Sequence, residues 1–251
     1  MIGAGNVATS LARALATWHE VVQVYSRHLA NAQALAEAVN CPIATDSLDQ
    51  IVGDADVYVI SVCDDAIAQV AAAVPDNGSA LWLHTSGTKP LNLLTASHSR
   101  CGVLYPMQSF SKQLTVDFSE VPVFVEGSTP EVLSDTETLA RSISNHVEEA
   151  DSNRRARLHI GAVMACNFAN HLWALTSEVL AEADIDFKVM LPLIRSTVAK
   201  LDQLSPAESQ TGPAARGDTA VTAAHENMLS GRKLEIYRLL TQSIVESTHK
   251  K

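Results

Sequence analysis

The stretch Gly3-Ala4-Gly5-Asn6-Val7-Ala8 opens a predicted helix and has the G-x-G-x-x-A form of a dinucleotide-binding turn. Gly3 permits the tight turn from strand to helix, Gly5 lets the backbone approach a pyrophosphate, and the small Ala8 lets the helix pack close to the strand. The free N–H groups and the positive dipole end of the helix then face the anion. We therefore predict a nucleotide site whose cofactor-binding residues are Gly3, Gly5, Asn6, Val7 and Ala8.

The residues that follow this helix indicate which dinucleotide is bound. A strand-like run, Val21-Val22-Gln23-Val24-Tyr25, ends in Ser26-Arg27. NAD-binding folds usually carry an acidic residue at the end of this second strand, where it accepts hydrogen bonds from the ribose hydroxyls. Ser26 and Arg27 offer a hydroxyl and a guanidinium instead, which suit a 2′-phosphate. The alternative is an arginine in a solvated loop; the pattern favours NADP(H).

The segment before the glycine turn is short. Only Met1 and Ile2 precede Gly3, although the first strand of such a fold lies at the centre of its sheet and a strand usually has about five residues. Either the natural start lies upstream or the fold accepts a two-residue strand. The sequence leaves both alternatives open.

The first part of the chain alternates strand-like and helix-like patterns, as βαβ units do. The run at 57–62 is continuously apolar, which is typical of a strand buried on both faces of a parallel sheet. Strands are predicted at 42–44, 57–62, 79–84, 102–105 and 121–125, and helices at 30–39, 48–51 and 66–73.

The pattern changes after residue 150. Residues 151–182 contain one glycine, Gly161, and no proline, and they predict a helix about 45 Å long. Further helices are predicted at 187–204, 219–229 and 233–247, with no strand after Val147. We therefore predict a Rossmann-like, doubly wound α/β domain at 1–150, followed by an all-helical domain for substrate binding and dimerisation at 151–251.

Composition excludes several classes of protein. Of the 251 residues, 47% are hydrophobic and 18% charged, which is ordinary for a globular chain. The formal net charge of -10 argues against nucleic acid as the main partner. There is no apolar run of 18 residues and no signal-peptide pattern, so we expect a cytoplasmic protein that does not bind membranes. The cysteines show no metal-binding or disulfide spacing and are expected to be reduced and buried: Cys41, Cys63, Cys101 and Cys166.

Polar residues follow three of the predicted strands, where ligands of open α/β sheets bind. Asp64 and Ser86 are predicted to bind the cofactor, although Ser86 can instead shape a turn. His84 is predicted as a catalytic proton donor or else as a structural histidine. Tyr105 is predicted to bind substrate, with aromatic packing as the alternative. For Asp65, capping of the following helix is favoured over catalysis.

The long helix carries a second polar group. Asn167, Asn170 and His171 lie within an apolar run, and their spacing places them on one helix face. Buried polar groups need partners, so these residues are predicted to line an active site or else to form a structural or dimer-interface network. His159 lies two turns earlier, near the same stripe.

A loop between two helices supplies a further candidate. The segment Thr211-Gly212-Pro213-Ala214-Ala215-Arg216-Gly217-Asp218 contains the residues that shape loops. Arg216 can bind a substrate carboxylate or phosphate, or it can pair locally with Asp218. The alternative is that this segment is a solvated loop with no binding role.

Six segments in this order resemble a family of bacterial proteins provisionally assigned as NADP oxidoreductases. The resemblance covers essentially the whole chain and implies a Rossmann-like N-terminal half and a helical C-terminal half of uncharacterised function. The family is similar in architecture to pyrroline-5-carboxylate reductases, deazaflavin-dependent NADP reductases and β-hydroxyacid dehydrogenases, and it implies no particular substrate. The segments are the glycine turn, Val24-Tyr25-Ser26-Arg27, His84-Thr85-Ser86-Gly87, Tyr105-Pro106-Met107-Gln108-Ser109-Phe110, Cys166-Asn167-Phe168 with Asn170-His171, and the loop ending in Arg216-Gly217-Asp218.

One departure from the related dehydrogenases bears on the chemistry. The β-hydroxyacid dehydrogenases carry Lys-x-x-Asn on their long helix, whereas this chain places Asn167 and Asn170 at the matching positions. An amide cannot serve as a general acid or base. The proton would then come from His171, His84, Tyr105 or water, or an imine substrate would arrive already protonated.

These observations predict an NADP(H)-dependent oxidoreductase that transfers hydride to or from a small C=O or C=N substrate in a cleft between the two domains. The alternative is a non-catalytic NADP(H)-binding sensor or scaffold, which the missing lysine favours, because a fold does not dictate function. The apolar helical half also predicts a homodimer formed through that half.

Overall fold

The structure is a computed structural model that describes residues 1–248. The chain divides into two compact units, Met1–Asn167 and the residues from Phe168 onward. A boundary at 150/151 was predicted; there α6 (Ser152–Ala162) begins, but its first turns pack on the sheet of the first unit. The compact units therefore separate later, within the long helical run. None of the described helices is long and apolar enough to cross a membrane.

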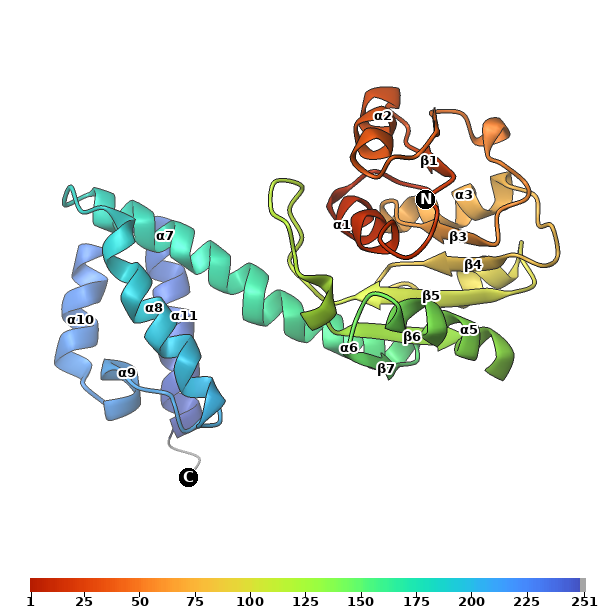
Figure 1. The fold of residues 1–251 in the computed structure, drawn as a ribbon. Coiled ribbons are helices and arrows are strands. Elements are labelled where there is room, and N and C mark those ends of the chain that lie inside the picture. The colour runs from red at the N-terminus through yellow and green to blue at the C-terminus, as the bar shows by residue number, and fades with distance from the viewer. Residues whose placement is uncertain (249–251) are drawn as a thin grey trace. The chain divides into compact units, whose positions relative to one another are not determined.

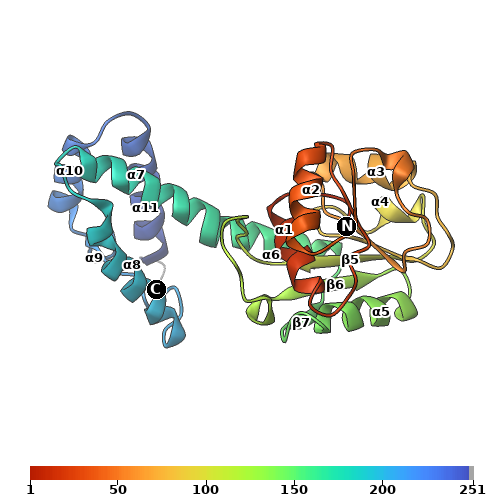
Figure 2. The ribbon, with the colours of Figure 1, turned by 45° about the horizontal axis from the view of Figure 1, so that its top comes forward.

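The first unit contains a largely parallel sheet with helices on both faces (Figures 1 and 2). Neighbouring strands pair in the order β2-β1 and β3-β4-β5-β6-β7, and all of these pairs are parallel except β5 with β6. The strands are β1 (Gln23–Tyr25), β2 (Ile43–Thr45), β3 (Val57–Ile60), β4 (Leu81–His84), β5 (Cys101–Pro106), β6 (Val123–Gly127) and β7 (Val147–Glu149).

The short segment before the glycine turn acts as the central strand. Ile2 donates its N–H to the carbonyl of Val59 and accepts from the N–H of Ser61, both at 2.8 Å. The Gly3 N–H donates to the carbonyl of Tyr25, also at 2.8 Å. Ile2 thereby bridges β1 and β3 in parallel and completes the 3-2-1-4-5-6 strand order of dinucleotide-binding folds.

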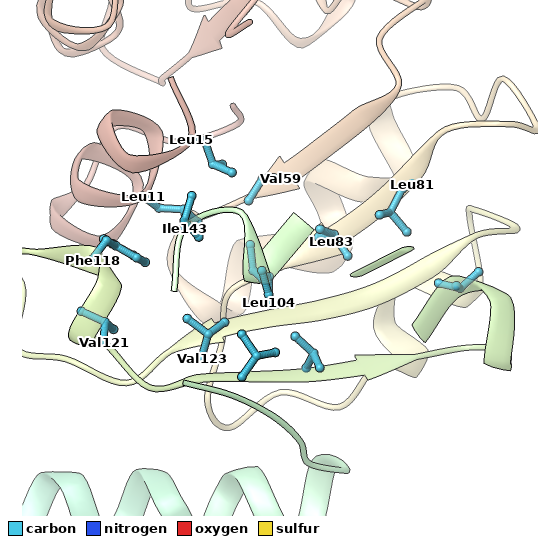
Figure 3. Packing of buried hydrophobic residues seen from close by; sticks show 14 residues of the cluster. Leu11, Leu15, Val59, Leu81, Leu83, Leu104, Phe118, Val121, Val123 and Ile143 are labelled. Carbon is cyan, nitrogen blue, oxygen red and sulfur yellow. The ribbon is translucent and has the colours of Figure 1, made fainter. Parts of the chain in front are cut away.

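Side chains along the strands alternate between the two faces of the sheet, as the pleat requires. Val59, Leu83 and Leu104 lie on the face covered by α1 and α5, where Figure 3 shows them packed near Leu11 of α1. Trp82 lies on the opposite face, in the cluster that includes α3 and α4. The doubly wound α/β fold predicted from sequence is therefore confirmed. Its helices are α1 (Asn6–Leu15), α2 (Leu29–Ala38), α3 (Ile67–Ala73), α4 (Asn92–Thr95), α5 (Pro130–Arg141) and α6, with 3₁₀ turns η1 (Leu48–Gln50), η2 (Asp64–Ala66) and η3 (Phe118–Glu120).

The second unit is helical, as predicted. A π-helical segment, Val163–Phe168, joins α6 to α7 (Ala169–Ala181) without a break. Within the described part of this unit Ala214 is the one buried residue. Many large apolar side chains are correspondingly exposed. The remaining helices are η5 (Phe187–Met190), α8 (Leu191–Ala199), η6 (Lys200–Asp202), α9 (Pro213–Arg216), α10 (Thr219–Met228) and α11 (Gly231–Thr248).

Two expectations from sequence are wrong. The strand β7 lies after the last predicted strand and extends beyond Val147. The cysteines are free, but they are not uniformly buried: Cys101 is buried, Cys41 is partly exposed, and Cys63 and Cys166 are exposed.

Candidate functional site

A cleft of about 680 Å³ lies at the carboxyl ends of the strands in the first unit. This is the edge at which ligands bind in open α/β sheets, beside the point where the strand order reverses. Residues from the glycine turn, the end of β1, the end of β3, the loop after β4 and the end of β5 line it. Among them are the predicted residues Gly3, Gly5, Asn6, Val7, Ser26, Arg27, Asp64, Ser86 and Tyr105.

The glycines of the turn have different local roles. Gly3 has a φ of +129°, and a Cβ there would lie 2.1 Å from the backbone oxygen of Ser61. This position therefore needs glycine for the protein's own packing. A Cβ on Gly5 would meet no protein atom within 4 Å, and among the described residues no side chain caps α1. The backbone N–H groups at the start of α1 are thus open to an anion from the cleft.

Ala8 lies behind the turn rather than in the cleft. It is fully buried and packs in a cluster with Val24 of β1 and Ala32 of α2. The predicted role of this small residue in close packing of helix on strand fits this position.

The end of β1 presents a cationic group to the cleft. Arg27 is exposed, lines the cleft, and has no ion-pair partner among residues 1–248. Ser26 lies beside it, and its Oγ accepts from the N–H of His28 at 3.4 Å. His28 and Asn31, at the start of α2, line the same part of the cleft. A free guanidinium beside uncapped amides is suited to a phosphate.

The ends of β3 and β4 are joined by hydrogen bonds. The Asp64 carboxylate accepts from Thr88 Oγ1 at 2.6 Å. Ser86 Oγ accepts from the N–H of Thr88 at 3.2 Å and from that of Lys89 at 3.0 Å. Ser86 therefore shapes the loop after β4 and also lines the cleft.

The predicted N-cap role of Asp65 is wrong. Asp64–Ala66 forms a 3₁₀ turn, so Asp65 lies inside that turn, and α3 has no side-chain cap. The Asp65 carboxylate pairs instead with Lys89 Nζ at 3.1 Å on the surface.

His84, predicted as a proton donor, does not line the cleft. Its side chain is fully buried, and Nδ1 accepts from the N–H of Ser86 at 3.2 Å. Burial, with a smaller contribution from the positive charge of Arg155, lowers the pKa of His84 to about 4. The imidazole is therefore neutral at pH 7 and holds the loop that follows β4, so the structure places this residue in a structural position.

Tyr105 contacts a residue that is not among the predicted site residues. Tyr105 Oη and His159 Nδ1, on α6, lie 3.2 Å apart and share a hydrogen bond. Both side chains line the cleft. Burial raises the pKa of Tyr105, opposed by the charge of Arg155. Gln108 and Lys112, from the loop after β5, also line the cleft and were not predicted.

Arg155 anchors α6 to the sheet. Its side chain is fully buried and forms an ion pair with Glu126 of β6. Its Nη2 donates to the carbonyl of Lys89 at 2.8 Å and its Nη1 to that of Ala150 at 3.2 Å. His159 lies four residues later and therefore on the same face of the helix.

The sequence profile described as "NADP oxidoreductase coenzyme F420-dependent" matches residues 1–81, and a domain of unknown function, DUF2520, matches residues 121–244. The structure matches the protein provisionally named NADP oxidoreductase BF3122, from Bacteroides fragilis, with a TM-score of 0.93 and 42% sequence identity over 98% of this chain and 96% of that one. The chain belongs to the same family of NADP oxidoreductases as this Bacteroides fragilis protein.

The family assignment confirms the resemblance seen in the sequence, the Rossmann-like fold, and NADP(H) as the family's cofactor. TM1727 from Thermotoga maritima has the same fold (TM-score 0.73, 21% identity, 99% and 97% of the two chains covered). So does the reductive aminase from Aspergillus terreus in complex with NADPH and ethyl-5-oxohexanoate (TM-score 0.68, 17% identity, 98% and 92% covered). Among curated proteins, none matches the sequence.

The predicted polar group on the long helix is exposed in this chain. Asn167 lies in the π-helical segment, and Asn170 and His171 lie in the first turn of α7. Within the described residues their side chains have no hydrogen-bond partner. Their role in substrate binding stays a prediction.

Arg216 lies in the second unit, at the end of α9, and is exposed. Among the described residues no ion pair joins Arg216 to Asp218. The Asp218 carboxylate instead caps α10 by accepting from the N–H of Val221 at 3.4 Å. Gly217 ends α9 with a φ of +70°, which turns the chain between the two helices. Anion binding by Arg216 stays a prediction.

Proposed function

We propose that this protein is an NADP(H)-dependent oxidoreductase that transfers hydride to or from a small C=O or C=N substrate. One observation carries the proposal: the glycine turn, the uncapped start of α1 and the exposed Arg27 line one cleft, at the strand ends where dinucleotides bind. Membership of the NADP oxidoreductase family supports it.

The chain's residues fit this cofactor. The pyrophosphate would be held by the N–H groups of Asn6 and Val7, opposite the open space in front of Gly5. The 2′-phosphate would be held by Arg27 with Ser26. When bound, the nicotinamide supplies or accepts a hydride. Asp64 and Tyr105 line the cleft from the ends of β3 and β5.

The substrate class is supported by the shared fold. Shared fold with a reductive aminase and with an imine reductase from Myxococcus stipitatus in complex with NADP⁺ is compatible with C=O and C=N substrates. Asn167, Asn170 and His171 are proposed to line the substrate, and Arg216 to hold a substrate anion.

Cofactor preference tests the proposal. Calorimetric titrations with NADPH and with NADH should show tighter binding of NADPH. Because a hydrogen bond to a charged group contributes about 1.5–3 kcal/mol, Arg27→Ala should weaken NADPH binding about 10- to 150-fold and leave NADH binding unchanged. Arg141→Ala, on α5, is the matched control. Equal affinity for both cofactors in the wild-type protein would contradict the proposal.

We also propose that a second copy of the chain covers the apolar helical unit. With Ala214 as its one buried described residue, this unit has no core of its own. A groove of about 470 Å³, lined mainly by apolar side chains of α7, α10 and α11, lies open in it. Surfaces of this kind mark association sites. Met228, at 78% exposure, lines the groove.

Sedimentation at micromolar concentration tests the dimer. The wild-type protein should sediment as a dimer, and Met228→Glu should shift it to monomer. Leu114→Glu, a charge placed on an exposed leucine of the first unit, is the control and should leave the dimer intact. A monomeric wild-type protein would overturn this proposal.

A second candidate function is an NADP(H)-binding sensor without turnover. It is favoured because this chain has an asparagine where the related dehydrogenases carry a lysine. NADPH binding without oxidation across a panel of keto acids, imines and aldehydes would favour the sensor over the enzyme.

A further inference from the structure

We propose that Tyr105 and His159 form the proton-donating pair of the reduction site. The inference rests on the proposed oxidoreductase function, selects Tyr105 from the proton sources that the sequence leaves open, and adds His159 as its partner. It assigns the phenol as the direct donor and the imidazole as the group that reprotonates it.

The first support is the position of the pair. The two side chains come from different elements, β5 and α6, and both line the cleft that the glycine turn also lines. Tyr105 Oη and His159 Nδ1 are 3.2 Å apart, and the rings meet edge to face with centroids separated by 6.1 Å. Tyrosine and histidine side chains can both act in general acid catalysis when they lie within hydrogen-bond reach of the proton that moves.

The second support is the space that Gly87 leaves for the pair. A Cβ at this position would lie 2.8 Å from Tyr105 Cζ and 2.9 Å from His159 Nδ1. Any other residue would push the two rings apart. The loop after β4 therefore lies directly against the two hydrogen-bonded side chains. Their closeness explains why the residue at this position is a glycine.

The third support is the fixed position of the helix. Arg155 binds Glu126 and two backbone carbonyls, and so holds the first turns of α6 on the sheet. His159 follows on the same face one turn later. Arg155 is thus a positioning residue for the imidazole.

Other candidate donors fit less well. His84 is buried and outside the cleft, with its Nδ1 engaged by Ser86. Asn167 and Asn170 carry amides, which cannot serve as general acids. His28 and Arg27 line the cleft at the start of α2, where the 2′-phosphate is proposed to bind.

In the proposed step, the carbonyl carbon of the substrate would gain a hydride from bound NADPH, the C=O π electron pair would move to the oxygen, and that oxygen would take the proton of Tyr105 Oη. The phenolate oxygen would then take the Nδ1 proton of the His159 imidazolium, which leaves a neutral imidazole. Solvent would return one proton (H⁺) to that imidazole. NADPH, the ketone and one solvent proton would thus give NADP⁺ and the alcohol.

The pair can be tested without a substrate. Because the oxidised nicotinamide carries a positive charge and the reduced ring does not, the phenol beside it should ionise more readily with NADP⁺ than with NADPH. Arg155, whose charge acts on the phenol, and His159, its hydrogen-bond partner, are the same in both complexes. So are Asp64 and Lys112, which line the same cleft. Carbon-13 NMR of ζ-labelled tyrosine, with Tyr105→Phe for assignment, measures the titration.

We expect the Tyr105 signal to titrate at lower pH in the NADP⁺ complex than in the NADPH complex, and that of Tyr237, in the second unit, to be unchanged. Identical Tyr105 titrations in the two complexes would overturn the proposal. Failure of either cofactor to bind would contradict the proposed function itself, which separates the two failures.

Turnover supplies a second test. Tyr105→Phe should lower kcat for a ketone about 10²- to 10⁴-fold, the usual contribution of a general acid. His159→Gln should lower it less, because solvent can still reprotonate the phenol. An N-methyl cyclic iminium cation needs hydride but no proton, so its reduction should be spared in both variants. His146→Gln, on the surface, is the control. Equal losses for both substrates would show a structural role and overturn the proposal.

Discussion

Arg155 of α6 and Glu126 of β6 form an ion pair in which the arginine side chain is fully buried. The pair ties the beginning of the long helix to β6, which lies between β5 and β7 in the sheet, and it explains why the first compact unit extends past the start of that helix. It also fixes the element that carries His159.

Removing the carboxylate should therefore destabilise the first unit strongly. Glu126→Ala leaves a buried guanidinium without its counter-charge, and we expect the free energy of unfolding to fall by about 3–5 kcal/mol. Denaturant unfolding at pH 7 measures this. The control is Glu148→Ala, which breaks the exposed pair with Arg154 and should cost about 0–1 kcal/mol. Equal effects of the two substitutions would refute the anchoring role.

Substitution at Gly87 should separate the two rings of the proton-donating pair. Gly87→Ala places a Cβ 2.8 Å from Tyr105 Cζ, so we expect ketone reduction to fall while NADPH binding is retained. Gly161→Ala is the matched control: nothing lies within 4 Å of its Cβ, and it should stabilise α6 by about 0.5–1 kcal/mol. Undiminished reduction by the Gly87 variant would count against the pair.

The two glycines of the nucleotide turn should differ in their response to alanine. Gly3→Ala drives a Cβ into the Ser61 carbonyl and should lower thermal stability. Gly5→Ala meets no protein atom, so stability should stay unchanged while NADPH binding weakens, because the methyl group occupies the pyrophosphate's approach. Thermal melts and NADPH titration of both variants check this. A Gly5 variant with wild-type affinity would contradict the proposed placement of the pyrophosphate.

The buried His84 should make stability depend on pH. Its pKa is lowered from 6.5 to about 4 in the folded protein, so the unfolded chain binds the proton first. The contribution to stability is complete above about pH 6.5 and is lost as pH falls towards 4; the shift corresponds to about 3 kcal/mol. Unfolding of wild type and His84→Asn at several pH values isolates this term. Parallel pH profiles would show that His84 does not contribute.

The fold could be predicted because its signals are local. The buried run at 57–62 and the glycine turn identify a parallel sheet and its nucleotide edge without any long-range knowledge. The strand β7 was missed because Val147–Glu149 contains one apolar residue and two exposed glutamates at the edge of the sheet. The expectation that Cys63 and Cys166 are buried is wrong. It rests on the general tendency of cysteine to be buried, which does not tell which way a loop or a helix face points.

The site could be predicted only in part. The residues of the turn and Ser26-Arg27 follow from a motif whose geometry is fixed by the backbone. Tyr105 and His159 are separated by 54 residues, and no pattern in the sequence joins them. The sequence leaves His84 open between a proton donor and a structural histidine, because a residue at a strand end can face the cleft or the core. The sequence holds one indication that α6 packs on the sheet: Arg155 places a charge on the same helix face as His159. The ion-pair partner of Arg155 could not be identified from the sequence.

Transfer of deuterium tests the central claim most directly. NADPH labelled with deuterium at C4 would be incubated with the wild-type protein and a panel of small ketones and cyclic imines, and the products examined by mass spectrometry. We expect a product that carries the label on the former C=O or C=N carbon, formed in step with NADPH oxidation. Bound NADPH that stays reduced with every member of the panel would contradict an oxidoreductase and favour the sensor.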